Sequence, residues 1–300
     1  MKNDSIIPKK MIFEGVATAI ATPFTNDEID YDAFELMIER QIECGIDALV
    51  FCGTTGEAPT LSENEKKEIF AFAKKTVCSR VPLIFGSGTN SHSSTMRLSE
   101  YAAGCGADAL LCVTPYYNKG TPDGIVRTYK DVCSLGVPVI LYNIPTRTGV
   151  DVGIELLRRL ADQETLCAIK ECSGIGRISN ICVEFPNEYC VYCGNDSEFL
   201  PSLSVGASGV ISVISNLYPA EMKKIYSLFC RGHNKEACRT HVLLSRITNL
   251  LFESTNPAPL KYALSKMGLC ENSLRLPLMP IDKHLCKKID EEMKKIEQNI

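Results

Sequence analysis

Lys170 is the residue whose position in the sequence most favours covalent chemistry. It ends the apolar segment 166–169 (Leu-Cys-Ala-Ile), which is typical of a buried strand. Desolvation among apolar side chains penalises the ammonium form, lowers the pKa and leaves a neutral amine that can form an imine with a ketone. The alternative is a lysine that reaches solvent along its aliphatic stem or pairs with a carboxylate.

Three further polar groups follow other apolar segments. The segment 53–56 (Gly-Thr-Thr-Gly) resembles an anion cradle, because glycines permit close backbone approach and N–H groups at a loop-to-helix junction favour a carboxylate. Tyr142 is suited to proton transfer near an imine, and Arg147 offers a planar fork for a second carboxylate. Each also has an ordinary interpretation: a simple turn, a core tyrosine and a surface charge.

Other cofactor chemistries are poorly supported. Gly86-Ser87-Gly88 begins like a dinucleotide fingerprint, but Ser91 stands where the third glycine belongs. The four histidines are dispersed along the chain and do not indicate a metal site. We therefore predict that the protein uses no cofactor and no metal.

The 15 cysteines are odd in number and lack the paired spacing of a disulfide framework. Cys190 and Cys193 form one C-x-x-C, but they fall in a predicted strand, where residues three apart point to opposite faces. We interpret most cysteines as small buried hydrophobic residues. A reducing cytoplasm follows from that interpretation.

Charge and hydropathy exclude several classes of partner. The formal net charge of −4 is spread along the chain, which disfavours nucleic acid. No apolar run approaches the roughly 18 residues of a membrane span. The first ten residues also lack the apolar centre of a signal peptide.

Eight short apolar segments, rich in β-branched residues, recur along the first two thirds of the chain. They read as continuous runs, as do strands that helices bury on both faces, and helical patterns lie between them. Gly45, Gly106 and Gly206 stand where a helix would stop before the next strand. We predict an α/β fold, a (β/α)8 TIM barrel over residues 1–230, with a C-terminal helical extension over residues 231–300. The eight predicted strands are Gly15–Ile20, Ala48–Cys52, Leu83–Gly86, Ala109–Val113, Val139–Tyr142, Cys167–Lys170, Tyr189–Gly194 and Gly209–Val213.

Six ordered motifs lie at or near the ends of these strands or in the C-terminal helices. They are Gly53-Thr54-Thr55-Gly56-Glu57, Val113-Thr114-Pro115-Tyr116-Tyr117-Asn118, Tyr142-Asn143-Ile144-Pro145-x-Arg147-Thr148-Gly149, Ile169-Lys170-Glu171, Gly209-Val210-Ile211-Ser212 and Asn256-Pro257-Ala258-Pro259. From about Phe13 to Pro280 the chain resembles the dihydrodipicolinate synthase family, within the superfamily of pyruvate lyases that includes N-acetylneuraminate lyase.

The resemblance implies a class I lyase of diaminopimelate and lysine biosynthesis. Lys170 would form a Schiff base with pyruvate, and the resulting enamine would attack L-aspartate 4-semialdehyde. Thr55 and neighbouring N–H groups would hold the pyruvate carboxylate, with backbone contact from Ile211. Gly194 would lie beside the Schiff base.

The remaining roles also follow from the resemblance. Tyr142 would transfer the protons of imine formation, relayed through Thr54 to Tyr117. In the family that last tyrosine comes from the adjacent subunit, so the resemblance implies a dimer as the smallest complete active site and a homotetramer, a dimer of dimers, as the usual assembly. Arg147 would anchor the carboxylate of the semialdehyde.

Two alternatives remain open from the sequence. The first is another pyruvate aldolase of the superfamily, such as N-acetylneuraminate lyase, although the Arg-Thr-Gly run at Arg147 favours the synthase. The second is a barrel that binds a small molecule without catalysis. At the family's lysine feedback site Asn90 and Tyr116 fit, but Glu63, Lys66 and Ser94 replace the expected residues. We therefore predict weak or absent inhibition by lysine.

Overall fold

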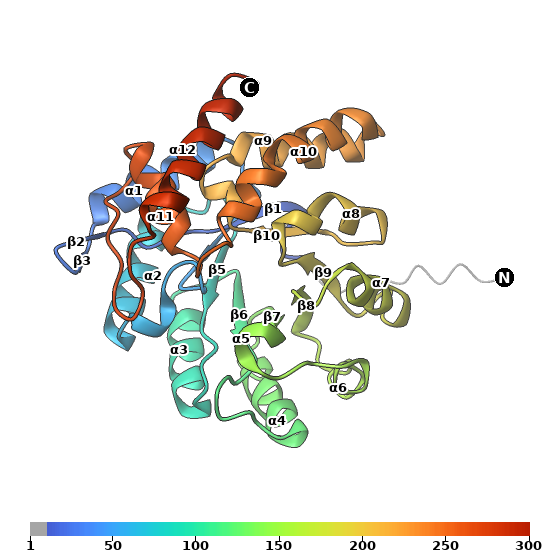
Figure 1. Ribbon diagram of the computed structural model, residues 1–300. Helices are drawn as coiled ribbons and strands as arrows, with labels where there is room; N and C mark the ends of the chain where they lie inside the picture. Colours follow the sequence, from blue (N-terminus) through green and yellow to red (C-terminus); the bar gives the residue numbers. More distant parts are fainter. Residues whose placement is uncertain (1–10) are drawn as a thin grey trace. The chain divides into compact units, whose positions relative to one another are not determined.

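Eight parallel strands form a closed barrel in the computed structural model, which describes residues 11–300 (Figure 1). Around the barrel the strand order is β1-β10-β9-β8-β7-β6-β5-β4. Each barrel strand is followed by a helix before the next one begins, so the predicted (β/α)8 fold is confirmed. The barrel strands are β1 (Gly15–Ala19), β4 (Ala48–Phe51), β5 (Leu83–Gly86), β6 (Ala109–Val113), β7 (Val139–Asn143), β8 (Leu166–Glu171), β9 (Cys190–Cys193) and β10 (Gly209–Ser212).

The strand ends lie within two residues of the predicted ones because the burial pattern is as expected. Every residue of β1, β4, β7 and β8 is buried, which matches their continuous apolar runs. The three joint glycines have positive φ: +74° at Gly45, +74° at Gly106 and +105° at Gly206. A side chain is strained in this region of backbone conformation, which explains the choice of glycine there.

Helices alternate with the strands and continue after the last strand. The sequence pattern predicts four C-terminal helices, and those of the structure begin and end within two residues of the predicted limits, which are Tyr218–Cys230, Lys235–Phe252, Pro257–Met267 and Ile281–Glu297. The helices are α1 (Tyr31–Glu43), α2 (Glu63–Val77), α3 (His92–Gly104), α4 (Pro122–Cys133), α5 (Pro145–Thr148), α6 (Ile154–Arg158), α7 (Ile175–Glu184), α8 (Phe199–Ser204), α9 (Pro219–Cys230), α10 (Asn234–Leu250), α11 (Ala258–Lys266) and α12 (Lys283–Glu297).

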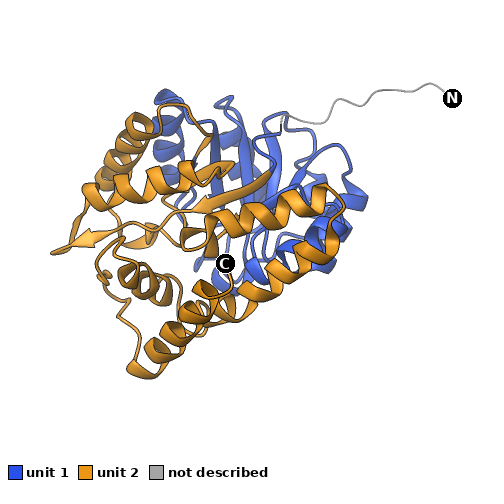
Figure 2. Cartoon of the chain, turned by 90° about the horizontal axis from the view of Figure 1, so that it is seen from above, with its two compact units in different colours: residues 1–14, 84–210 blue, residues 15–83, 211–300 orange. Residues whose placement is uncertain are grey.

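The chain divides into two compact units, coloured separately in Figure 2. The first unit contains Ile84–Val210 and the segment that ends at Glu14. Within it, β7 pairs with β8 so that Tyr142 lies opposite Lys170, and β8 pairs with β9 so that Lys170 lies opposite Tyr192. Register partners in a sheet point to the same face, so these three side chains share one side of the sheet.

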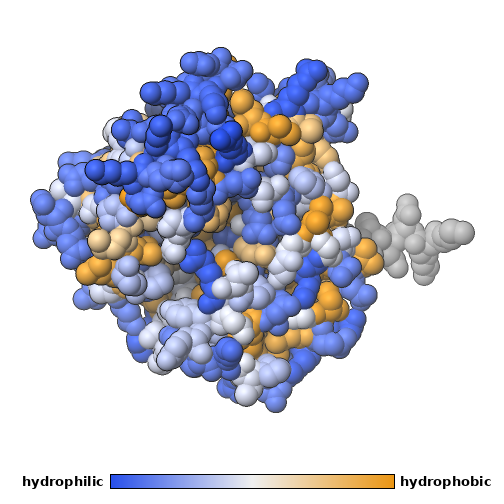
Figure 3. Space-filling view, in the orientation of Figure 1, coloured by the Kyte–Doolittle hydropathy of each residue, from blue (hydrophilic) through white to orange (hydrophobic). Residues whose placement is uncertain are grey.

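The second unit contains Gly15–Leu83 and Ile211–Ile300. It includes a short antiparallel hairpin that we did not predict, formed by β2 (Phe24–Thr25) and β3 (Glu28–Ile29). Helix α12 contacts α10 and α11, and it buries the apolar side chains Leu285, Ile289, Met293 and Ile296. Its other face is charged, and the region of α12 is strongly hydrophilic in Figure 3.

Several predictions bear on features outside the barrel strands. All 15 cysteines are free thiols, and most of them are buried or partly buried. Cys78, Cys230 and Cys238 are exposed, so the interpretation as buried residues does not hold for these three.

Within residues 11–300 no helix is long and apolar enough to cross a membrane. The absence of a signal peptide concerns residues 1–10, which lie outside the described part. The division at residue 230 between barrel and extension stays a prediction.

Candidate active site

Lys170 lies near the end of β8 with its side chain buried. The residue is 6% exposed, and its Nζ lies 4.3 Å from the centre of the Tyr142 ring. Because Tyr142 is its register partner on β7, the two side chains are held together by strand pairing and not by a loop. Lys170 therefore does not reach solvent as a surface lysine would.

Burial lowers the pKa of Lys170 below its ordinary value of 10.5. Desolvation is the largest cause, and the positive charge of Arg147 acts in the same direction. Cys172, Asp196 and Cys193 oppose the shift but do not cancel it. A larger fraction of neutral amine near neutral pH is the condition that imine formation requires.

Gly194 follows β9 and borders the lysine side chain. A methyl group built there would lie 3.2 Å from Lys170 Cε and 2.1 Å from Cys172 Sγ. No side chain fits in that space without moving one of these groups, so glycine leaves the room beside the amine. Gly194 thus borders Lys170, and its place beside a Schiff base stays a prediction.

A polar network, buried at Asn143 and Glu171 and exposed at Asp151, holds the ends of β7 and β8. The Asn143 amide donates to both Glu171 carboxylate oxygens at 3.0 Å and to Asp151 Oδ1 at 2.9 Å. Glu171 also accepts from the Ser173 N–H at 2.6 Å, and its pKa is raised by burial. Arg177 donates to Asp151 Oδ2 at 2.6 Å and thereby closes the network. These bonds fix the strand ends on which Tyr142 and Lys170 lie.

Arg147 lies on the short helix α5 and is exposed. The helix ends at Gly149, with φ of +69°, and Thr148 donates to the carbonyls of Ile144 and Val150. These bonds fix the turn that presents Arg147, and its charge is close enough to affect the pKa of Lys170. An exposed guanidinium near a buried amine is suited to a second carboxylate at the rim of the site.

The loop 53–57 lies in the second unit and follows β4. Thr55 is 2% exposed, and its Oγ1 accepts a hydrogen bond from Asn256 Nδ2 at 3.1 Å. Thr22 Oγ1 donates to the Gly56 carbonyl at 2.8 Å, and a methyl group at Gly56 would lie 3.2 Å from both Thr22 Oγ1 and the Ile20 carbonyl. Thr54, in contrast, is partly exposed. Hydrogen bonds to Thr55 and Gly56 therefore fix the loop in place, as a preformed anion cradle requires.

Of the remaining predicted site residues, Ile211 is buried and Tyr117 is exposed. Ile211 is completely buried on β10. Tyr117 follows β6, is 89% exposed and has a positive φ of 69°. A bulky residue in that backbone conformation is strained.

Comparison with known proteins identifies the family. The Dihydrodipicolinate synthetase family matches residues 12–296. The chain belongs to this family. The 4-hydroxy-tetrahydrodipicolinate synthase of Hydrogenobaculum sp. (strain Y04AAS1) is 41% identical over 284 residues, which cover 94% of this chain and 98% of that protein. The enzyme of that name from Thermotoga neapolitana is 41% identical over 275 residues, covering 90% and 94% of the two chains.

Solved structures of dihydrodipicolinate synthases have the same fold. The enzyme of Methylacidiphilum fumariolicum SolV superposes with a TM-score of 0.93 at 37% identity, over 95% of this chain and 96% of that chain. The Aquifex aeolicus enzyme gives a TM-score of 0.92 at 37% identity, over 95% and 98% of the chains. The resemblance inferred from the motifs is confirmed.

Sequence reasoning assigned no role to two residues near Lys170, Cys172 and Asp196. Burial raises the pKa of Cys172 to about 11, and a hydrogen bond with Tyr142 opposes part of that shift. Asp196 is 4% exposed and interacts with the Lys170 charge. The position of Asp196 after β9 was a usable signal, because polar residues at the ends of barrel strands face the active-site end.

Proposed function

We propose that this chain is a 4-hydroxy-tetrahydrodipicolinate synthase that condenses pyruvate with L-aspartate 4-semialdehyde through a Schiff base on Lys170. The observation that carries the proposal is the buried amine of lowered pKa over the Tyr142 ring, in a chain whose relatives bear that enzyme name. The reaction belongs to diaminopimelate and lysine biosynthesis, and we place it in the cytoplasm.

The chemistry begins at the neutral amine. Lys170 Nζ adds to the ketone carbon of pyruvate, and loss of water from the carbinolamine gives an iminium. The iminium withdraws electrons, so the methyl group loses a proton and an enamine forms without a metal. The enamine carbon then bonds to the aldehyde carbon of the semialdehyde. Finally, the amine of the substrate attacks the imine carbon, and Lys170 leaves as the ring closes.

Proton transfer is the role we assign to Tyr142. Its ring lies beside Lys170 Nζ, and its phenol can both donate and accept a proton as water leaves the carbinolamine. We propose that Thr54 passes the proton to Tyr117. In the family this tyrosine enters the active site of a second copy of the chain. Tyr117 is 89% exposed on the single chain, and it would become buried when two copies assemble. This exposure supports a dimer, and we propose that two such dimers form the homotetramer usual in the family.

Two carboxylates must be bound for the condensation. We propose that Thr55 and its neighbouring N–H groups hold the carboxylate of pyruvate, with backbone contact from Ile211. The Asn256 amide donates to Thr55 Oγ1, which leaves the hydroxyl proton available for a carboxylate oxygen. Arg147 would take the carboxylate of the semialdehyde in a bidentate arrangement.

Borohydride trapping tests this function directly. The protein is incubated with pyruvate, reduced with borohydride and digested, and the modified peptide is identified by mass spectrometry. A reduced pyruvate adduct on Lys170, together with turnover of L-aspartate 4-semialdehyde, is expected. An adduct without that turnover would indicate another pyruvate aldolase, and the absence of any adduct would favour a non-catalytic barrel.

A further inference from the structure

A second buried lysine forms an ion pair with the loop that carries Thr55. Lys261 on α11 pairs with Glu57 at the end of the loop 53–57, and both side chains are 0% exposed. Fully buried charges are rare because removal from water is costly, and they are kept where a partner compensates them. This pair lies within the second unit and is not part of the proton relay proposed above.

The ammonium group of Lys261 has a complete set of partners. Besides Glu57, it donates to the Ser273 carbonyl at 2.8 Å, and it lies 4.0 Å from the centre of the Phe24 ring. A carboxylate, a carbonyl and an aromatic face together satisfy three donors. Burial lowers the pKa of Lys261, and Glu57 is the main influence that opposes this shift.

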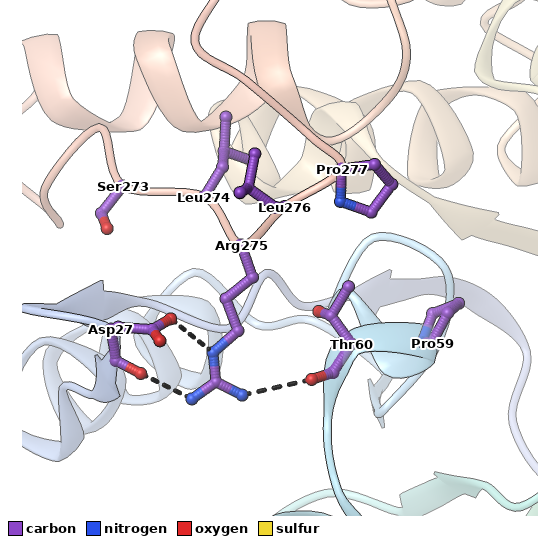
Figure 4. A pocket seen from close by; sticks show the side chains of 8 residues that line it. All are labelled: Asp27, Pro59, Thr60, Ser273, Leu274, Arg275, Leu276 and Pro277. Carbon is purple, nitrogen blue, oxygen red and sulfur yellow. Dashed lines mark hydrogen bonds and ion pairs between the residues drawn. The ribbon is translucent and has the colours of Figure 1, made fainter.

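The other oxygen of Glu57 is also held by the C-terminal part of the chain. The backbone N–H of Arg275 donates to Glu57 Oε2 at 3.1 Å. Figure 4 shows the Arg275 side chain reaching across a cavity of about 660 Å³ toward Asp27 and the carbonyl of Thr60. Both oxygens of the carboxylate are thus fixed, and Glu57 itself has a positive φ of 54°.

A buried negative charge at this position works against the function of the loop. Glu57 comes two residues after Thr55, the residue assigned to the pyruvate carboxylate. An uncompensated carboxylate there would repel an anionic substrate. Asn256, two residues before α11, contacts Thr55, and Lys261, one turn into the helix, contacts Glu57. The same segment therefore orients the hydroxyl and neutralises the acid.

We propose that Lys261 is a positioning residue for the ketoacid site, which cancels the charge of Glu57 and holds the loop 53–57 ready for a carboxylate. This inference rests on the proposed function. At an effective dielectric constant of about 20, two unit charges roughly 10 Å apart interact strongly enough to change binding by about tenfold or more. Loss of the Lys261 charge alone should therefore weaken pyruvate binding on that scale.

The experiment measures the pyruvate concentration that gives half-maximal borohydride trapping of Lys170, so it needs no second substrate. The variants are Lys261→Met, Glu57→Gln and the double variant. Lys223→Met is the matched control, because Lys223 also forms an ion pair with an acidic residue near β4. Its partner Asp47 lies before that strand, whereas Glu57 lies after it. The pairs thus lie at opposite ends of one strand, and only one is beside the cradle. Melting temperatures are recorded for all proteins.

The proposal predicts a pattern of signs. Lys261→Met raises the half-saturating pyruvate concentration about tenfold or more, Glu57→Gln lowers it, and the double variant returns to within roughly threefold of the original protein. A purely structural role would make all three variants bind pyruvate less well. That result, or unchanged binding in Lys261→Met, would overturn the proposal. The control should lose stability without a change in pyruvate binding.

Two further measurements keep the test decisive. Should Lys261→Met fail to fold, Lys261→Gln keeps a donor toward the Ser273 carbonyl and must show the same weakening. Should neither fold, an unchanged or weakened pyruvate affinity in Glu57→Gln rejects the proposal. Turnover with saturating pyruvate should fall less than pyruvate affinity does. Failure of trapping in the unmodified protein would instead reject the proposed function.

Discussion

Gly194→Ala should slow imine formation because the new methyl group collides with the surroundings of Lys170. The built methyl carbon lies 2.1 Å from Cys172 Sγ, whereas ordinary contacts begin at 3.4 Å. The two groups must therefore move apart by 0.9 Å to reach the 3.0 Å limit of real contacts, and by 1.3 Å to reach ordinary contact. Lys170 Cε, at 3.2 Å, must also give way slightly.

The cost can be estimated from overpacked protein cores. Overpacking of this kind costs about 1–3 kcal/mol, and each 1.36 kcal/mol corresponds to about tenfold in rate. We therefore expect the single-turnover rate of pyruvate trapping to fall roughly 10- to 100-fold. The assay is quenched-flow borohydride trapping, with the melting temperature measured in parallel.

A second substitution should reverse most of the effect. Cys172→Ala removes the Sγ atom and leaves only the 3.2 Å contacts of the new methyl group with Lys170 Cε and the Glu171 carbonyl. The double variant should then trap pyruvate within about fivefold of Cys172→Ala alone, because the residual overlap is small. Gly176→Ala is the control, since nothing lies within 4 Å of a methyl group there. An undiminished trapping rate in Gly194→Ala, or a double variant as slow as the single one, would refute this account.

Four further outcomes are expected. Tyr142→Phe should lower the rate of condensation by about 10²- to 10⁴-fold, as loss of a positioned proton donor does, and a smaller effect in steady-state assays would argue against the relay. Arg147→Met should raise the KM for the semialdehyde much more than it slows pyruvate trapping, which loses only the smallest of the causes that lower the pKa of Lys170; equal loss of both would place Arg147 elsewhere. The neutral fraction of the Lys170 amine grows with pH, and because its pKa is lowered the trapping rate should level off below pH 10.5. A rate that still rises above that pH would contradict the lowered pKa. Lysine at sub-millimolar concentration should not half-inhibit the enzyme, and half-inhibition in a titration would show that the substituted feedback site still binds it.

The barrel could be predicted because each strand is buried on both faces. A strand such as Leu166–Glu171 leaves a continuous apolar run in the sequence, and a glycine of positive φ marks many of the joints. The hairpin at Phe24–Ile29 was missed because its strands have only two residues each. Its turn nevertheless carried a signal: Asn26 and Asp27 both have positive φ, as a tight hairpin turn requires.

The site could be predicted only where one residue type implies its own chemistry. Lys170 at the end of an apolar run favoured a nucleophile, but the run alone left open a lysine that reaches solvent or pairs with a carboxylate, and only the six motifs taken together decided for the nucleophile. The role of Asn143 depends on Glu171 and Asp151, which only the pairing of β7 with β8 and the following loop bring together. Likewise, Lys261 reads as one charged residue in a helical pattern, and its partner Glu57 lies far earlier in the sequence. Long-range pairs of this kind leave no local periodicity to detect.

The counter-charges of two buried lysines explain which one can act as the nucleophile. Burial lowers the pKa of both Lys170 and Lys261. Lys261 is compensated by Glu57 and by the Ser273 carbonyl, so its ammonium form is retained and its electron pair is not available. Within residues 11–300, Lys170 forms no ion pair and lies over the face of Tyr142, so a proton is lost from it at less cost. Trapping with pyruvate should therefore modify Lys170 and leave Lys261 unmodified, even at high pyruvate concentration.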